Sequence, residues 1–315
     1  MKLFGDSIQL NKPTMFFIGV TTHNSFVNQV FCDWLKIINK DAELIGVNLP
    51  VGCDEKEYSK IVSFIKSQPL ALGALVTTHK VRLYNSTKQL FDNLPDPCNE
   101  FQEIGCIYKK GDALCGEVTD IFSVQSALYS FLELDYFSKR NSDFCILGGG
   151  GAGLALAYRI LTDNNPKPQR LVLTDINKHR LLEIEHIIKK YDASNILELY
   201  HVENYADSIV EALKSQSVIV NATGLGKDKE GSPFSEKNNI PKESYLWEFN
   251  YRWDNKPNFY NIAKEQERYK KLKLIDGWIY FIYGWMQVMS RVFHIENISN
   301  YFNDFLEAAN SKNIK

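Results

Sequence analysis

Apolar and polar positions follow two different periods along the first part of the chain. Short apolar runs at residues 15–20, 44–49 and 72–76 are typical of buried strands. Between them, apolar side chains recur at helical spacing over residues 27–38 and 55–67. Strands that alternate with helices at these intervals indicate a parallel α/β arrangement.

The pattern changes after residue 100. Two short extended runs, at residues 104–108 and 113–116, flank Lys109 to Asp112 and predict a hairpin. Thr119 and Asp120 then open a helix that is expected to run to about Tyr136.

The rest of the chain returns to alternating strands and helices. Strands are predicted at residues 144–147, 171–173, 197–201, 218–221, 245–250 and 272–274, and helices at residues 154–161, 179–191, 205–214, 259–269 and throughout 277–309. A polar linker at residues 138–143 marks a domain boundary. We therefore predict an α/β protein with domains at residues 1–137 and 138–275, followed by C-terminal helices over residues 276–315.

Four consecutive glycines, Gly148 to Gly151, separate a predicted strand from a predicted helix. Gly148, Gly150 and Gly153 have the spacing of the dinucleotide-binding fingerprint. In that fingerprint the first glycine makes the turn, the second lets the pyrophosphate approach and the third lets the helix pack on the strand. A flexible glycine loop is the alternative, but the flanking strand and helix favour a Rossmann-type NAD(P) site that includes Gly151.

The strand after this helix ends at Asp175, where an acidic residue accepts hydrogen bonds from the ribose hydroxyls of the cofactor. The separation exceeds the usual value of about 20 residues, and the polar insert Thr162 to Arg170 absorbs the excess in a loop. Because a carboxylate repels a 2′-phosphate, NAD is expected rather than NADP. NADP remains possible, since Lys178, His179 and Arg180 follow closely.

Composition restricts the class of protein. The 315 residues suggest about two domains, and 44% apolar with 23% charged residues is ordinary for a globular protein. A net charge of −2 without a dense basic run argues against nucleic acid as a partner. Neither the cysteines nor the histidines have metal-ligand spacing, and the six scattered cysteines suggest free thiols in a reducing cytoplasm.

No targeting segment or membrane span is predicted. Residues 1–13 contain no basic region followed by an apolar core, so no signal peptide is expected. The most apolar segment, residues 277–289, is shorter than the about 20 residues that a spanning helix needs.

Six short motifs occur in the order found in the shikimate/quinate dehydrogenase family, which this chain resembles over nearly its whole length. They are Thr77 to Lys80 (Pro-His-Lys in the family), Gly116 to Asp120 (Gly-x-Asn-Thr-Asp), Leu147 to Gly153 (the glycine loop), Asn221 to Gly226 (Asn-Ala-Thr-Pro-x-Gly), Glu248 to Tyr251 (Asp-x-x-Tyr) and the tail residue Gln287.

The resemblance implies a function in aromatic amino acid biosynthesis. It implies hydride transfer between NAD(P) and a ring hydroxyl or ketone of a shikimate- or quinate-like cyclic hydroxy acid. It also implies that the first domain binds the substrate and that the C-terminal helices pack back on this domain. The implied catalytic pair is Lys80 and Asp120. Alcohol oxidation needs a base for the proton, and a lysine serves where desolvation lowers its pKa. The alternative is that Lys80 caps a helix from the surface.

Further site residues are carried over from the family. The implied cofactor contacts include Asn221, Thr223 and Gly226, and the implied substrate contacts are Thr21, His23, Tyr108, Tyr251 and Gln287. His79 is expected to be only a loop-packing residue.

Several positions depart from the family pattern. Thr21 and His23 lie near the positions at which the family has two serines. Ala74, Val76, Tyr108 and Val118 stand where the family has polar residues. Because a site that hydrogen-bonds each hydroxyl depends on such groups, a ring less polar than shikimate is expected as the best substrate.

Two other functions are compatible with parts of the sequence. One is a dinucleotide-binding sensor or partner protein that has lost catalysis, which the retained Lys80 and Asp120 disfavour. The other is a methylene-tetrahydrofolate-type dehydrogenase, which the tail does not support. We expect a small-molecule substrate and a monomer or homodimer.

Overall fold

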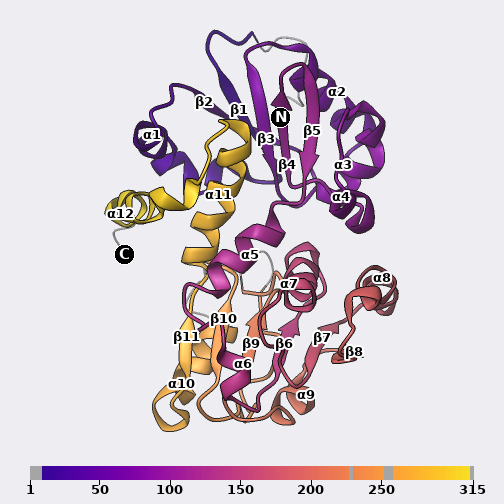
Figure 1. Cartoon of the computed structure of the whole chain (residues 1–315), viewed down its shortest axis with the longest axis vertical. Helices are drawn as coiled ribbons and strands as arrows, with labels where there is room; N and C mark the ends of the chain where they lie inside the picture. Colours follow the sequence, from indigo (N-terminus) through magenta and orange to yellow (C-terminus); the bar gives the residue numbers. More distant parts are fainter. Residues whose placement is uncertain (1–8, 227–229, 252–257, 313–315) are drawn as a thin grey trace. The chain divides into compact units, whose positions relative to one another are not determined.

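The computed structural model describes residues 9–226, 230–251 and 258–312. Two compact units make up the chain: residues 1–119 with 282–315, and residues 120–281 (Figure 1). The first unit therefore contains the end of the chain. The segment after residue 119, predicted to close the first domain, is grouped with the second unit.

The sheet of the first unit is mixed. Its strands are β1 (Thr14–Gly19), β2 (Glu43–Asn48), β3 (Ala71–Val76), β4 (Cys106–Lys110) and β5 (Ala113–Glu117), in the order β2-β1-β3-β4-β5. β1 pairs in parallel with both β2 and β3, whereas β4 runs antiparallel to β3 and β5. All six residues of β1 are buried, as expected for a central strand.

Helices cover both faces of this sheet. They are α1 (Val27–Ile37), α2 (Glu55–Ser67), α3 (Lys80–Thr87), α4 (Asp96–Phe101), α12 (Phe302–Lys312) and most of α11 (Trp278–Val292), with short 3₁₀ turns η1 (Thr22–Asn24), η2 (Lys88–Leu90) and η4 (Ile298–Tyr301). Phe16 contacts Phe64 of α2, whereas Phe17 contacts Trp285 of α11. Since neighbouring strand residues point to opposite faces, α2 and α11 lie on opposite faces of the sheet.

The last helix is fixed to the first. Trp34 of α1 stacks on Phe305 of α12, with ring centroids 5.1 Å apart and planes 13° from parallel. The indole N–H of Trp34 also donates a hydrogen bond to the Phe305 carbonyl at 3.0 Å. Helix α12 is thus part of the core of the first unit.

The second unit contains a sheet in which the paired strands are all parallel. Its strands are β6 (Phe144–Leu147), β7 (Leu171–Asp175), β8 (Leu197–His201), β9 (Val218–Asn221), β10 (Tyr245–Glu248) and β11 (Lys273–Ile275), in the order β11-β10-β9-β6-β7-β8 (Figure 1). This is the doubly wound dinucleotide-binding order, in which the strand order reverses between β6 and β9. The predicted α/β class with a Rossmann-type domain is confirmed.

The helices of the second unit connect these strands. They are α5 (Asp120–Leu128), α6 (Tyr136–Lys139), α7 (Gly151–Thr162), α8 (Lys178–Ile188), α9 (Asp207–Glu211) and α10 (Phe259–Lys270), with η3 (Lys189–Tyr191) after α8. Within the described part of the chain, every helix is too short or too polar to traverse a lipid bilayer. The sequence of residues 1–13 predicted that no signal peptide is present. Residues 1–8 of this segment lie outside the described residues.

Three predicted helices differ from the structure. The helix expected from residue 119 to 136 ends at Leu128, and the chain then places Phe131 against Trp247 and Tyr245 of β10. The tail is not continuously helical, because His294 and Asn297 adopt positive φ angles after α11. The helix expected over residues 205–214 shortens to Asp207–Glu211.

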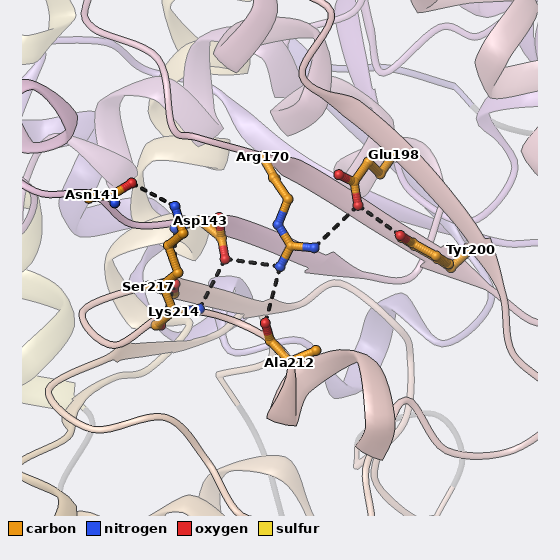
Figure 2. A network of polar contacts seen from close by, with 8 residues as sticks. All are labelled: Asn141, Asp143, Arg170, Glu198, Tyr200, Ala212, Lys214 and Ser217. Carbon is orange, nitrogen blue, oxygen red and sulfur yellow. Dashed lines mark hydrogen bonds and ion pairs between the residues drawn. The ribbon is translucent and has the colours of Figure 1, made fainter.

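A network of polar and charged side chains around Asp143 lies at the amino ends of the strands in the second unit (Figure 2). Asp143, fully buried before β6, accepts hydrogen bonds from the Arg170 guanidinium and the Lys214 N–H, each at 3.0 Å. Arg170 also reaches Glu198 of β8 at 3.4 Å, and Glu198 accepts the Tyr200 hydroxyl hydrogen at 2.8 Å. Because ligands of such sheets bind at the carboxyl ends of the strands, this network has a structural role.

Candidate functional site

The glycine loop turns the chain directly at the carboxyl end of β6. Gly148 has a φ of +105°, a conformation that favours glycine. A Cβ atom there would lie 2.9 Å from the backbone carbon of Ala222 and the backbone nitrogen of Thr223. The loop after β6 therefore packs against the loop after β9, at the point where the strand order reverses.

The other glycines of the fingerprint have distinct surroundings. A Cβ on Gly153 would lie 2.0 Å from the Gly148 carbonyl oxygen, so α7 approaches the loop at a distance only glycine permits. A Cβ on Gly150 would meet nothing within 4 Å. Gly150 precedes α7 and Gly151 is its first residue, where free N–H groups favour a phosphate. The open space at Gly150 fits a bound pyrophosphate.

Asp175 and Arg180 hold the glycine loop from the side of β7. The Asp175 carboxylate accepts the Gly149 N–H through Oδ2 and the Asn177 N–H through Oδ1, each at 2.8 Å. Arg180 donates from Nε to the Gly149 carbonyl at 2.7 Å and pairs with Glu183 at 3.0 Å. Each carboxylate oxygen keeps acceptor capacity for a ribose hydroxyl.

Sequence reasoning did not identify Gly149 as a site residue. Its N–H and carbonyl are the two atoms that Asp175 and Arg180 bind. A Cβ at this position would lie 2.5 Å from the Ile184 side chain of α8. The signal in the sequence was the run of four glycines, which is longer than the fingerprint requires.

The loop after β9 carries the remaining predicted cofactor residues. Asn221, fully buried, accepts hydrogen bonds from the Thr223 N–H at 3.0 Å and the Thr223 hydroxyl at 2.6 Å. Gly226 ends the described part of this loop with a φ of +87°, beside Asn258. The structure thus brings Thr223 next to the glycine loop and places Asn221 beneath it.

In the first unit, the loop after β1 is fastened by Thr22. Its N–H and hydroxyl both donate to the Asn48 side-chain oxygen, at 2.7 and 2.8 Å. Thr22 is buried, whereas its neighbours Thr21 and His23 are exposed. The two predicted substrate residues therefore flank an anchored position at the carboxyl end of β1.

Lys80 is the first residue of α3 and is half-buried. A Cβ on Gly105 would lie 3.6 Å from Lys80 Cε and 3.6 Å from the Thr119 hydroxyl oxygen. The Lys80 stem and Thr119 therefore flank the same glycine. Asp120 follows Thr119 in the chain as the first residue of α5 and is also half-buried.

His79 fixes the start of α3. Its Nε2 lies 2.9 Å from the Leu49 carbonyl, so Nε2 carries the hydrogen, and Nδ1 accepts the Tyr58 hydroxyl hydrogen at 2.8 Å. Burial lowers the pKa of His79 below its ordinary value. His79 is thus a neutral packing residue that holds the helix carrying Lys80.

The lowered pKa of His79 makes the stability of the protein sensitive to pH. The unfolded chain binds a proton at this residue near the ordinary histidine pKa of about 6.5, whereas the folded chain resists it. Stability is expected to fall as the pH drops through this value, by about 1.4 kcal/mol for every pH unit that separates the two pKa values. Urea unfolding at pH 7.5 and 5.5 measures this loss.

His79→Gln should lessen that pH dependence, because a glutamine amide can replace both hydrogen bonds without titrating. His23→Gln, at an exposed histidine, is the control and should leave it unchanged. An equal loss of stability in wild type and His79→Gln would contradict the assignment.

Gln287 is placed by an ion pair one helical turn away. Arg291 of α11 binds both carboxylate oxygens of Glu117, with Nη2 3.2 Å from Oε1 and a second bond from Nε to Oε2. Residues four apart share one face of a helix. Gln287 therefore lies on the same face of α11 as Arg291, the face directed toward Glu117 at the end of β5. Glu117 stands two residues before Thr119.

Tyr108 lies farther from the strand ends. It pairs with Gly73 of β3, three residues before Val76, the last residue of that strand. Burial, together with the Glu117 carboxylate, raises the pKa of Tyr108 to about 12. The phenol therefore stays protonated at neutral pH.

The apolar replacements are part of the core. Ala74 and Val76 are buried and pair with Phe16 and Ile18, on the sheet face that α2 covers. Val118 is also buried. These positions supply packing where the family pattern has polar side chains.

Tyr251 belongs to an aromatic cluster in the second unit. Its ring centroid lies 4.3 Å from that of Phe281 and 6.0 Å from that of Trp278. Trp278 and Phe281 stack on each other at 5.6 Å. The predicted substrate tyrosine thus lies against the first turn of α11.

No cluster of metal-ligating side chains is found among the described residues. All six cysteines are free, and four of them are buried.

No protein-family model matches the chain. A curated relative, shikimate dehydrogenase (NADP(+)) of Streptococcus thermophilus, is 26% identical over 182 residues, which are 56% of this chain. The chain spans 58% of the length of that relative.

Solved structures match over nearly the whole chain. Shikimate dehydrogenase from Aquifex aeolicus has a TM-score of 0.72 at 18% identity, covering 98% of this chain and 100% of that one. Quinate dehydrogenase from Corynebacterium glutamicum in complex with NAD has a TM-score of 0.69 at 15% identity, covering 94% and 99%. Shikimate 5-dehydrogenase from Thermus thermophilus, in complex with NADP(H) and shikimate, has a TM-score of 0.70 at 16% identity, covering 95% and 99%.

These structural likenesses show that the chain has the fold of the shikimate and quinate dehydrogenases. The sequence match is to a curated shikimate dehydrogenase, and the fold is shared with shikimate and quinate dehydrogenases, the proteins whose motif order this chain resembles.

Proposed function

We propose that this protein is an NAD(P)-dependent dehydrogenase that transfers hydride between the nicotinamide and a ring hydroxyl or ketone of a cyclic hydroxy acid. The observation that carries this proposal is the meeting of the glycine loop, Asp175 and the loop after β9 where the strand order reverses. Open sheets of this type bind ligands at that position.

The residues of the second unit fit a dinucleotide. The N–H groups at the start of α7 would hold the pyrophosphate over Gly150, where a side chain is absent. Asp175 would accept the hydroxyl hydrogens of the adenosine ribose. Thr223 and Gly226 lie in the loop that would contact the nicotinamide half. When bound, the nicotinamide supplies the hydride acceptor.

The proposed acid–base group is Lys80. Its stem lies beside Gly105 and Thr119, and the side chain is half-buried. Lys80 would take the hydroxyl proton of the substrate during oxidation and return it during reduction. Asp120, next to Thr119 in the chain, would orient the ammonium group and the substrate hydroxyl.

The proposed substrate is a cyclic hydroxy acid with fewer hydroxyl groups than shikimate. The buried side chains Ala74, Val76 and Val118 offer no hydrogen bonds where the family pattern has polar residues. Thr21, His23, Tyr251 and Gln287 are proposed to contact this substrate. Tyr108 is included with them on the family resemblance alone.

The preferred cofactor is proposed to be NAD, because a 2′-phosphate near Asp175 would meet its negative charge. Asp175→Asn removes that charge and keeps one acceptor oxygen. We expect the ratio of kcat/KM for NADP to that for NAD to rise about tenfold, the size of a charge interaction of 1–2 kcal/mol near a protein surface. Initial rates with both cofactors measure the ratio.

Glu183→Gln is the matched control for this change. It releases Arg180 from its ion pair but leaves the Asp175 carboxylate in place. If Glu183→Gln raises the ratio as much as Asp175→Asn does, Arg180 rather than Asp175 determines the preference. A wild-type preference for NADP would end the proposal.

The activity itself is tested by following NADH formation at 340 nm. The test substrates are shikimate, quinate and cyclic hydroxy acids with one hydroxyl fewer. Turnover of at least one of them supports the proposal. Tight NADH binding without turnover of any would favour the alternative, a dinucleotide-binding sensor that has lost catalysis.

We propose that the protein acts in the cytoplasm, since free cysteines persist in a reducing compartment. We also propose that it is a monomer or homodimer without a nucleic-acid partner, which light scattering and a gel-shift assay would test.

A further inference from the structure

A buried carboxylate stands at the carboxyl end of β10, outside the site residues named so far. Glu248 is 3% exposed. Its Oε1 accepts hydrogen bonds from the Asn250 N–H and side-chain amide, each at 2.8 Å, and its Oε2 accepts the Asn221 side-chain amide at 2.7 Å. These amide donors satisfy a charge that would otherwise be costly to bury.

The partners of Glu248 bind the loop after β9. Asn221, whose amide nitrogen donates to Glu248, uses its oxygen to accept both donors of Thr223. Asn250 donates to the Leu225 carbonyl at 3.1 Å, and Asn221 donates to the same carbonyl at 3.4 Å. The carboxylate therefore fixes the orientation of two amides that hold this loop at Thr223 and at Leu225.

The loop that is held in this way forms one side of the dinucleotide site. A Cβ atom on Gly148 would lie 2.9 Å from its backbone at Ala222 and Thr223, so this loop packs closely on the glycine loop. A carboxylate can only accept, so it requires both Asn221 and Asn250 to turn their NH₂ groups toward it. That requirement leaves the Asn221 oxygen facing Thr223 and the Asn250 amide facing Leu225.

We propose that Glu248 is a positioning residue for the nicotinamide half of the cofactor site. This rests on the proposed function. Glu248 acts through Asn221 and Asn250 and sets the loop from Ala222 to Gly226, whereas Asp175 and Arg180 set the adenosine side independently from β7 and α8. The two halves of the cofactor therefore depend on separate polar networks.

Glu248→Gln tests this separation. The glutamine NH₂ would face the amide donors of Asn221 or Asn250, so one of these amides must turn and release the loop. We expect the Kd for NADH to rise about tenfold and the Kd for 5′-AMP, which fills only the adenosine half, to stay within twofold. Fluorescence titration of NADH and calorimetry with 5′-AMP measure the two constants.

Three further variants make the test selective. Asp143→Asn, the same change at the amino end of the sheet, should lower the Tm but keep the ratio of the two Kd values. Glu248→Asp should restore part of the NADH affinity, because the charge returns. Asn250→Ala removes the shorter of the two hydrogen bonds to the Leu225 carbonyl without leaving a buried unpaired charge, so it should weaken NADH binding selectively even if Glu248→Gln does not fold.

The outcomes separate this proposal from the proposed function. Wild-type protein that binds neither NADH nor 5′-AMP would contradict the function and, with it, this inference. Wild-type protein that binds both, with equal losses for the two ligands in Glu248→Gln and Asn250→Ala, would overturn the positioning role alone.

Discussion

Lys80→Met is expected to lower kcat by about 10²–10⁴-fold, the usual contribution of a general acid–base group. Methionine retains the apolar stem that lies along Gly105 and Thr119 but cannot exchange a proton. The start of α3 should remain in place, because His79 holds it through Leu49 and Tyr58. The KM for NAD should change little, since the cofactor residues belong to the other unit. Steady-state kinetics with the substrate found at 340 nm measures both constants.

Lys66→Met is the matched control for this loss. Lys66 is in the same unit and has an ordinary surface ion pair with Asp92. Its replacement should leave kcat unchanged and alter stability by less than about 1 kcal/mol. A decrease in kcat of less than tenfold in Lys80→Met would remove Lys80 from the mechanism.

Gly153→Ala is expected to destabilise the second unit and to abolish measurable NADH binding. The new methyl group would lie 2.0 Å from the Gly148 carbonyl oxygen, a backbone atom that cannot move without opening the turn after β6. Overpacking of this kind typically costs about 1–3 kcal/mol. Thermal unfolding should show a Tm several degrees lower, and fluorescence titration should show the loss of NADH binding.

Two other glycines distinguish effects on the fold from effects on the ligand. Gly150→Ala meets no atom within 4 Å, so the Tm should change little, whereas the methyl group would occupy the space proposed for the pyrophosphate. Gly284→Ala, inside α11 and equally uncrowded, should raise stability by about 1 kcal/mol through helix propensity and leave NADH binding unchanged. Tight NADH binding by Gly150→Ala would refute the proposed position of the cofactor.

The strands and the cofactor loop could be predicted because their signals are local. The apolar run Phe144 to Leu147 followed by glycines defines a buried strand and a tight turn without knowledge of any distant contact. The same holds for the alternation that predicted β1 to β3. The α/β fold class follows from these runs, whereas the strand order and the place where it reverses came from the structure.

The missed features depend on residues far apart in the sequence. The predicted helix after Asp120 stops early because Phe131 packs against Trp247, a contact that no local pattern reveals. The Glu117–Arg291 ion pair joins residues 174 positions apart. The short helices α3 and α4 have too few turns to show a clear period.

Within the candidate site, the sequence offered candidate side chains but not the partners that hold them. Asp175 was expected to serve the ribose, and its bond to the Gly149 N–H came only from the structure. Glu248 was seen as part of a motif, but a carboxylate in a sequence gives no sign that it is buried among amides.

The contact between Trp34 and Phe305 has a consequence for synthesis on the ribosome. The second unit is one uninterrupted stretch and can acquire its structure while α12 is still being translated. The first unit begins earlier but lacks α12 until residues 302–312 have been translated, so α1 leaves the exit tunnel long before its stacking partner exists. Premature termination before Phe305 would therefore release a chain in which the sheet of the second unit can form. The core of the first unit would lack the contact between Trp34 and Phe305.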